Sequence, residues 1–465
     1  MNRTIQIHFL GAAGTVTGSK HLIELAGKKL LIDCGLFQGL KKLRLLNWEY
    51  LPVEAASIDA VLLTHAHLDH TGYLPRLVKS GFKGKIYGTA PTLYIAEIIL
   101  RDSAKIQEEE AEQANKKGYS KHKPAKPLYD LKDAERTFSR FEEITRSEWT
   151  LLFEDINVRF QPVGHILGAC FIELEVWGKR LVFSGDIGQT QDFLLYPPEK
   201  PEQADLLFLE STYGDRLHPK GDIEQELLQI IQDTYRDGGT LIIPSFAVER
   251  TQTLMYLLWQ LREKGLMPNM PVFMDSPMGA NVLHVFHKFS FWHKLINGDC
   301  EKMCAYIKTV TNFRETWEVI DDKRPKIVIA GSGMVTGGRV LTYLTRYLHR
   351  PETRVLLVGY QAEGTRGRQL LEGVHEVKIY GQYYPVKAKI LELQGLSAHA
   401  DQQELLDWLA VIKNTPEKVF IVHGEAHAAD VLRVKIRDKY GWDCMVPELF
   451  SIETIAWKTE KRTEK

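Results

Sequence analysis

Apolar runs that end in metal-capable side chains recur along this chain. The most distinct run occupies residues 60–63 and is followed at once by His65, His67, Asp69 and His70. Its apolar half predicts a buried strand, and its polar half predicts a loop that leads from the strand into a helix. His65 and His67 are two residues apart, so in extended backbone they point the same way and can share one ion. Asp69 and His70 follow as the chain turns and could face a second ion.

Four more predicted strands end in residues of the same kind. Asp33, His165, Asp186 and Glu210 follow the apolar segments 29–32, 158–162, 180–184 and 205–209. Side chains at the carboxyl ends of neighbouring strands converge in space, and layered α/β proteins build their sites there. A carboxylate beside a metal site often holds a histidine ligand by its second nitrogen, which is one interpretation of Asp33. A turn or capping aspartate is the other.

The middle of the chain alternates between strand and helix patterns. Strands are predicted over residues 240–243, 272–274, 327–330 and 355–358, and helices over residues 223–236 and 244–261. This order is typical of a parallel sheet with helices on its faces. Elsewhere we expect hairpins over residues 22–32 and 171–184, and helices over residues 71–80, 91–112 and 402–411.

Two loops in this middle part could bind an anion. Ser245 to Arg250 opens a predicted helix, and the stretch from Gly331 to Arg339 offers small residues for close backbone approach. Arg366 adds positive charge in a glycine-bordered segment, which suits phosphate geometry. Neither loop matches the P-loop pattern, so the sequence does not support nucleotide hydrolysis. A purely structural turn explains each loop equally well.

Length and composition place the chain among ordinary globular proteins. Its 465 residues favour two domains, and a formal net charge of −1 means that a polyanion must meet a local basic surface. Residues 116–127 form the most basic segment and carry Tyr119, so contact with a phosphate backbone is one interpretation and a solvated loop the other. The five cysteines are scattered without a CxxC pair. We expect a cytoplasmic protein without a signal peptide or membrane span.

The order of the motifs resembles a known family. His65-Ala-His67-Leu-Asp69-His70, with His165 and Asp186 downstream, resembles the metallo-β-lactamase fold. Glu210, residues 397–401 (Ser-Ala-His-Ala-Asp) and residues 422–425 (Val-His-Gly-Glu) resemble its β-CASP subgroup, nucleases of RNA and DNA related to the mRNA 3′-end cleavage factor.

This resemblance implies a fold and its division into domains. The fold class is α/β, a four-layer αββα sandwich interrupted by a β-CASP domain that contains a parallel sheet flanked by helices. The sandwich would comprise residues 1–211 and 386–465, and the inserted domain residues 212–385.

The resemblance also implies roles for individual residues. The first ion would be bound by His65, His67 and His165, and the second by Asp69, His70 and His423, with Asp186 bridging them. His399 would be the general acid, Glu210 would orient it, and Asp33 would support a ligand. The catalytic set is then His399, Glu210 and Asp69. Contacts with substrate phosphates are expected from the two loops and the arginine named above, at Ser245, Arg250, Gly331, Ser332, Gly333, Thr336, Gly337, Arg339 and Arg366.

Ligand chemistry and resemblance together point to a nuclease. Histidine-rich ligation with only two carboxylates favours two Zn²⁺ over magnesium, and Mn²⁺ or Fe²⁺ accept similar ligands. Two such ions activate water and steady an in-line displacement at phosphorus. We therefore expect hydrolysis of single-stranded RNA to 5′-phosphate and 3′-hydroxyl ends. The alternatives are a DNA nuclease, another hydrolase on the same fold and a binding protein that does not cut; a homodimer stays open.

Overall fold

The computed structural model describes residues 3–118, 122–296 and 298–457. The chain forms two compact units, one of residues 1–190, 197–217 and 399–465, the other of residues 191–196 and 218–398. The domain boundaries predicted at residues 211/212 and 385/386 stay a prediction. Tyr119, the aromatic residue of the basic segment, lies outside the described residues.

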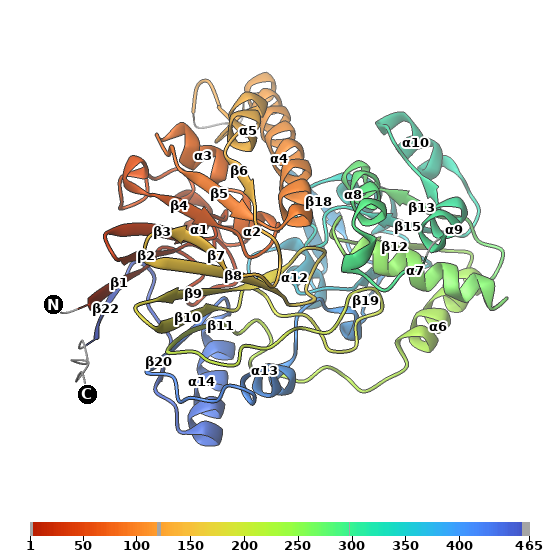
Figure 1. Ribbon diagram of the computed structural model, residues 1–465. Helices are drawn as coiled ribbons and strands as arrows, with labels where there is room; N and C mark the ends of the chain where they lie inside the picture. The colour runs from red at the N-terminus through yellow and green to blue at the C-terminus, as the bar shows by residue number, and fades with distance from the viewer. Residues whose placement is uncertain (1–2, 119–121, 297, 458–465) are drawn as a thin grey trace, which may run out of the picture. The chain divides into compact units, whose positions relative to one another are not determined.

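Two seven-stranded sheets form the centre of the first unit (Figure 1). The first sheet has the order β22 (Ile452–Trp457), β1 (Arg3–Phe9), β2 (His21–Leu25), β3 (Lys28–Ile32), β4 (Ala60–Leu62), β5 (Lys85–Gly88) and β6 (Phe141–Glu143). The second has the order β21 (Cys444–Met445), β20 (Lys418–Val422), β11 (Leu206–Glu210), β10 (Lys179–Phe183), β9 (Cys170–Val176), β8 (Ile156–Pro162) and β7 (Thr150–Phe153).

The two sheets pack face to face, and helices cover their outer faces. The ring of Phe9 in β1 lies 6.1 Å from that of Phe208 in β11 and 5.2 Å from that of Phe420 in β20. In Figure 1 one group of helices covers the first sheet and another the second. The first group comprises α2 (Leu68–Thr71), α3 (Leu74–Lys79), α4 (Ala90–Lys117) and α5 (Leu131–Phe138), and the second comprises α13 (Gln402–Leu409) and α14 (Ala426–Tyr440). A short helix, α1 (Lys41–Leu46), follows the loop after β3.

Parallel pairing brings the polar strand ends to one edge. β3 pairs in parallel with β4, and β11 pairs in parallel with both β10 and β20. The residues that follow these strands therefore lie at the same level, and this explains why chemistry gathers there.

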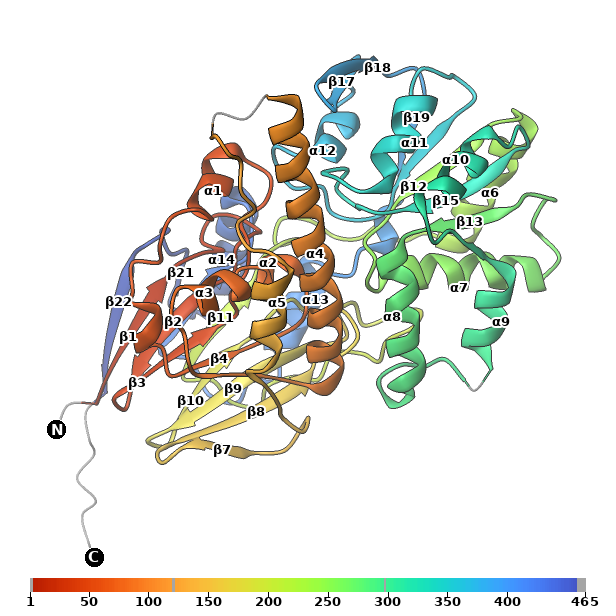
Figure 2. The same cartoon turned by 90° about the horizontal axis from the view of Figure 1, so that it is seen from above.

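The second unit has a six-stranded parallel sheet between two layers of helices (Figure 2). Its order is β14 (Lys308–Thr309), β13 (Val272–Asp275), β15 (Lys326–Ala330), β12 (Thr240–Pro244), β16 (Arg354–Leu357) and β19 (Lys389–Glu392). Successive residues of β12 face opposite cores: Leu241 and Ile243 pack with one group of helices, and Ile242 packs with the other. The first group is α6 (Ile223–Arg236), α7 (Arg250–Glu263), α8 (Pro277–Lys288) and α9 (Asp299–Tyr306), and the second is α10 (Phe313–Asp321), α11 (Arg339–Tyr347) and α12 (Arg366–Leu371). A hairpin of β17 (Glu376–Ile379) and β18 (Gln382–Pro385) completes the unit.

Three predicted helices differ from the structure by more than two residues at one end. Residues 71–80 do not form one helix, because Pro75 lacks the N–H that a continuous helix would use; Pro75 lies instead in the first turn of α3, which begins at Leu74. The helix predicted from residue 244 begins only at Arg250, since Glu249 has φ +66° and cannot lie inside a helix. α4 continues to Lys117, where Gly118 ends it in the left-handed conformation.

Within the described parts of the chain, we find no helix with the length and apolar character needed to cross a bilayer.

Candidate metal and catalytic site

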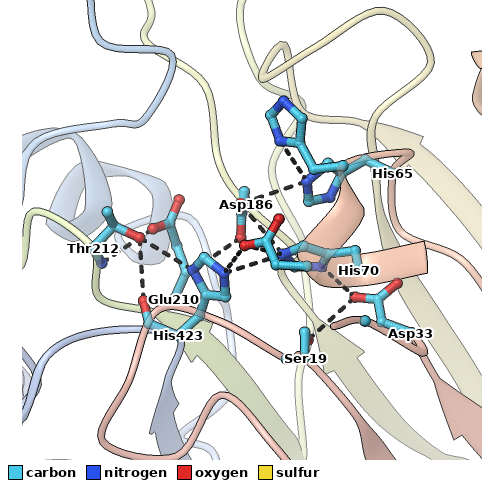
Figure 3. A network of polar contacts seen from close by, with 12 residues as sticks. Ser19, Asp33, His65, His70, Asp186, Glu210, Thr212 and His423 are labelled. Atoms are coloured by element: carbon cyan, nitrogen blue, oxygen red, sulfur yellow. Dashed lines mark hydrogen bonds and ion pairs between the residues drawn. The ribbon is translucent and has the colours of Figure 1, made fainter. Parts of the chain in front are cut away.

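Six of the predicted site residues lie at strand ends of the first unit. They are Asp33 after β3, His65 after β4, His165 after β8, Asp186 after β10, Glu210 at the end of β11 and His423 after β20. Asp69 and His70 lie on α2, directly after the histidine loop. Figure 3 shows how these side chains from both sheets converge.

The first group of ligand atoms belongs to three histidines. Nδ1 of His67 lies 3.1 Å from Nε2 of His65 and 3.1 Å from Nε2 of His165. Oδ2 of Asp186 lies 3.5 Å from the Nε2 atoms of His65 and His165. These four residues meet the distance requirement for holding one metal ion together.

The second group lies beside the first and shares Asp186 with it. Nε2 of His70 is 3.1 Å from Nε2 of His423, and Oδ2 of Asp69 is 3.4 Å from the same His423 atom. The Oδ2 atom of Asp186 is also 3.5 Å from Nε2 of His70. One carboxylate oxygen therefore faces both groups, which is the position that a bridging ligand needs.

The donor set fits a pair of divalent cations. A tetrahedral zinc ion with Zn–N bonds of 2.0–2.1 Å spaces its nitrogens about 3.3 Å apart, close to the distances found here. Burial lowers the pKa of His65 well below its ordinary value and that of His67 to about 4, which favours the neutral imidazole that binds metal. Oδ1 of Asp186 is buried, accepts no hydrogen bond from the described residues and lies 3.3 Å from Nδ1 of His423.

Asp33 contacts the ring nitrogen of His70 that faces away from the second ligand group. Its Oδ2 lies 2.7 Å from Nδ1 of His70, leaving Nε2 to face the second group. The carboxylate also accepts hydrogen bonds from the backbone N–H of Thr64, at 2.8 Å, and from the Thr64 hydroxyl. Burial opposes charge on His70, but Asp186 and Asp33 outweigh it and raise the pKa of His70 well above its ordinary value. Negative charge is thus concentrated where a cation would lie.

Backbone contacts fix the helix that carries Asp69 and His70. The carbonyl of Asp69 accepts from Ser19 N at 2.8 Å, and that of His70 accepts from Cys34 N at 2.7 Å. A Cβ atom on Gly35 would lie 1.5 Å from the Asp69 carbonyl oxygen, so only glycine permits this approach.

His399 and Glu210 form a pair next to the ligand groups. The Nδ1 atom of His399 lies 3.2 Å from Oε1 of the fully buried Glu210, and the His399 ring is 4.5 Å from that of His165. Glu210 accepts backbone hydrogen bonds from Ile187 at 2.6 Å and Thr212 at 3.2 Å. Burial lowers the pKa of His399, but the charge of Glu210 outweighs it, and the pKa of His399 lies above its ordinary value. The structure thus provides an imidazole that can carry a proton.

The predicted phosphate-contacting residues all belong to the second unit. The Arg339 guanidinium pairs with the buried Asp275 at 3.1 Å, and Arg366 donates to the carbonyls of Val335, Thr336 and Lys378. In the loop before α11, the Ser332 hydroxyl accepts from the N–H groups of Thr336 and Gly337. Ser245 and Arg250 are buried at the end of β12 and the start of α7. Phosphate contact by these residues stays a prediction.

Sequence reasoning missed two supporting hydroxyls. Thr64 Oγ1 lies 3.1 Å from Nδ1 of His65, and Thr212 Oγ1 lies 3.2 Å from Nδ1 of His423. Each threonine follows a predicted strand. A threonine close to a predicted site residue at a strand end was therefore the sequence feature that could have identified both.

Comparison with known proteins places these motifs in a family. Residues 14–237 match the metallo-β-lactamase superfamily, residues 251–370 the β-CASP domain, and residues 383–447 the Zn-dependent metallo-hydrolase RNA specificity domain. Ribonuclease TTHA0252 of Thermus thermophilus is 36% identical over 89% of this chain and 92% of its own. Transcription termination factor FttA of Methanocaldococcus jannaschii is 29% identical over 90% of this chain and 67% of its own.

A solved structure shows the same fold. A protein of unknown function from Enterococcus faecalis covers 98% of this chain and all of its own, with a TM-score of 0.54 at 14% identity. The chain belongs to the metallo-β-lactamase superfamily, and within it to the proteins that carry a β-CASP domain. The α/β fold class and the family resemblance inferred from the sequence are confirmed.

Proposed function

We propose that this protein is a metal-dependent ribonuclease that hydrolyses phosphodiester bonds of single-stranded RNA. The observation that carries the proposal is the pair of adjoining ligand groups that share Asp186, with His399 and Glu210 beside them. Ribonuclease TTHA0252, a relative of which this chain covers 92%, is named a ribonuclease, and this supports RNA as the substrate.

We assign two zinc ions to the two ligand groups. The first ion would be held by His65, His67 and His165, the second by Asp69, His70 and His423, and both by Asp186. When bound, the ions would supply water activated near neutral pH and positive charge at the reacting phosphate.

The protein's own residues position and protonate the substrate. Glu210 fixes the His399 ring through Nδ1, which leaves Nε2 to donate a proton to the departing 3′ oxygen. Ile187 and Thr212 hold Glu210 through their N–H groups, so the pair is oriented before substrate arrives. Cleavage in this direction leaves a 5′-phosphate and a 3′-hydroxyl. The loops at Ser245–Arg250 and Gly331–Arg339 remain our candidates for holding substrate phosphates.

Metal content and product analysis test this function together. Protein purified without added metal is expected to contain about two zinc ions per chain, which mass spectrometry measures. It should cut 5′-labelled single-stranded RNA into fragments with 5′-phosphates, and the same assay on DNA of equal sequence decides between the two nucleic acids. Intact metal without cleavage of either polymer contradicts the proposal.

The variant His399→Ala tests whether His399 acts as the general acid or as a metal ligand. The variant should retain its metal and lose about 100-fold or more of its RNA cleavage rate. Loss of metal in this variant would instead make His399 a ligand.

A further inference from the structure

The β17–β18 hairpin presents two different faces. Val377 and Ile379 are buried in the core beside α11 and α12, which fixes the hairpin on the second unit. Lys378 pairs with Tyr383 across the strands and points away from this core. Tyr383 is 62% exposed, and Tyr380 at the turn is 58% exposed. Two aromatic rings thus face solvent on a rigid support.

The turn holds Tyr380 in an unfavourable conformation. Tyr380 has φ +49° and Gly381 has φ +83°, so both residues are left-handed. Two-residue hairpin turns of this kind normally take Asn-Gly or Asp-Gly, because bulky side chains strain the backbone there. Folding alone does not explain a tyrosine at this position, and strain of this type accompanies binding sites.

Two cationic side chains, Lys378 and Arg366, contact the hairpin that carries the two tyrosines. The Lys378 ammonium lies 5.4 Å from the centre of the Tyr383 ring. Arg366 donates from Nε to the Lys378 carbonyl at 2.7 Å and from Nη1 to the carbonyls of Val335 and Thr336. This arginine therefore fixes the hairpin relative to the loop before α11. The acidic Glu376 is exposed on the same strand as Lys378.

We propose that Tyr380 and Tyr383 form a stacking platform for bases of single-stranded RNA, with Lys378 contacting the phosphate between them. The inference rests on the proposed ribonuclease function. Aromatic rings interleaved with cations bind single strands without sequence preference, since every base has a flat face. Protein interfaces are enriched in tyrosine but depleted in lysine, so the Lys378 ammonium beside the Tyr383 ring favours a polyanion over a protein partner.

Kinetics on long and short substrates test the platform. The double variant Tyr380→Ala/Tyr383→Ala should raise KM for long single-stranded RNA about 10-fold or more and leave kcat unchanged. Turnover of the small diester bis(p-nitrophenyl) phosphate should not change. Replacing both tyrosines with Phe keeps the rings and should behave as the wild type. Tyr235→Ala, which removes another exposed tyrosine of the same unit, is the matched control.

Photo-crosslinking of the wild type provides a test that does not depend on the variants folding. Single-stranded RNA containing 4-thiouridine should crosslink to residues of the hairpin, identified by peptide mass spectrometry. An unchanged KM together with crosslinks only elsewhere overturns the proposal. So does a wild-type dimer that the double Ala variant converts to monomer, because the hairpin would then join two copies. If the wild type cleaves neither RNA nor the small diester, the ribonuclease function fails, while crosslinking still decides the platform.

Discussion

Glu210 is buried and has no Lys or Arg partner among the described residues, and three contacts define its role. Its carboxylate faces His399 and accepts two backbone hydrogen bonds. Glu210→Gln preserves the size of the side chain but removes the charge that favours protonated His399. We expect kcat for RNA to fall about 100-fold, with the metal content unchanged because Glu210 is outside the proposed ligand set.

The control for this variant is Glu202→Gln, which changes an exposed carboxylate. It should leave both kcat and metal content unaltered. If Glu210→Gln lost zinc together with activity, Glu210 would be a ligand instead of a partner of His399.

Lys326 gives the second unit a pH-dependent stability. Its side chain is buried at the start of β15, where Nζ donates to the Asp322 carbonyl, and burial lowers the pKa of Lys326 to about 8 from 10.5. Between pH 8 and pH 10.5, Lys326 is protonated in the unfolded chain and neutral in the folded chain. The free energy of unfolding therefore rises with pH across this window, and the full cost of burying the charge is present below pH 8.

Lys326→Met should remove this dependence. The variant is expected to gain stability over the wild type below pH 8, by about 1.4 kcal/mol for each unit of pKa shift, and the gain should shrink towards pH 10.5. Denaturant unfolding at several pH values measures it. Lys323→Met, at an exposed position, should show no such trend.

At the scale of elements, the site depends on how closely two loops approach. The added methyl group in Gly35→Ala would collide with the Asp69 carbonyl and displace α2. We expect the variant to bind zinc at least about 10-fold more weakly, because Asp69 and His70 both move, and isothermal titration can measure this. Gly221→Ala, where nothing lies within 4 Å, should bind zinc as the wild type does.

Strand ends were predictable because their signal is local. A buried apolar run followed by His65, Asp186 or Glu210 carries its own evidence of burial and chemistry, and parallel pairing then brings such ends together. Short or half-exposed elements carry a weaker signal. β7 has no buried residue, and neither has α1, so tertiary contacts instead of periodicity define them.

Backbone conformation and side-chain partners were less predictable. Because Glu249 has a left-handed backbone conformation, α7 begins several residues later than predicted. A glutamate in the sequence does not indicate this conformation. An arginine in a glycine-rich segment suggests phosphate binding, yet the guanidinium of Arg339 pairs with Asp275, a residue 64 positions earlier in the chain. Such long-range pairs cannot be read from one sequence.

At the scale of the molecule, each unit has its own core, and all the proposed ligands belong to the first. Chelation of the metal should therefore lower the melting temperature of the first unit and leave that of the second unchanged. Metal present at about 1,000 times its Kd stabilises a folded state by about 4 kcal/mol, so a decrease of about 5–10 °C is expected. Differential scanning calorimetry before and after chelation measures both transitions, and equal shifts would contradict this assignment.

The order of the proposed ligands along the chain affects when the site can be completed during synthesis. His65, His67, Asp69, His70, His165 and Asp186 precede residues 218–398, and His423 follows them. A ribosome therefore adds the last ligand only after it has made the whole second unit. A growing chain can collect the first group of ligand atoms early, but it cannot assemble the second until then. The second group of proposed ligands is therefore incomplete until His423 has been added to the growing chain.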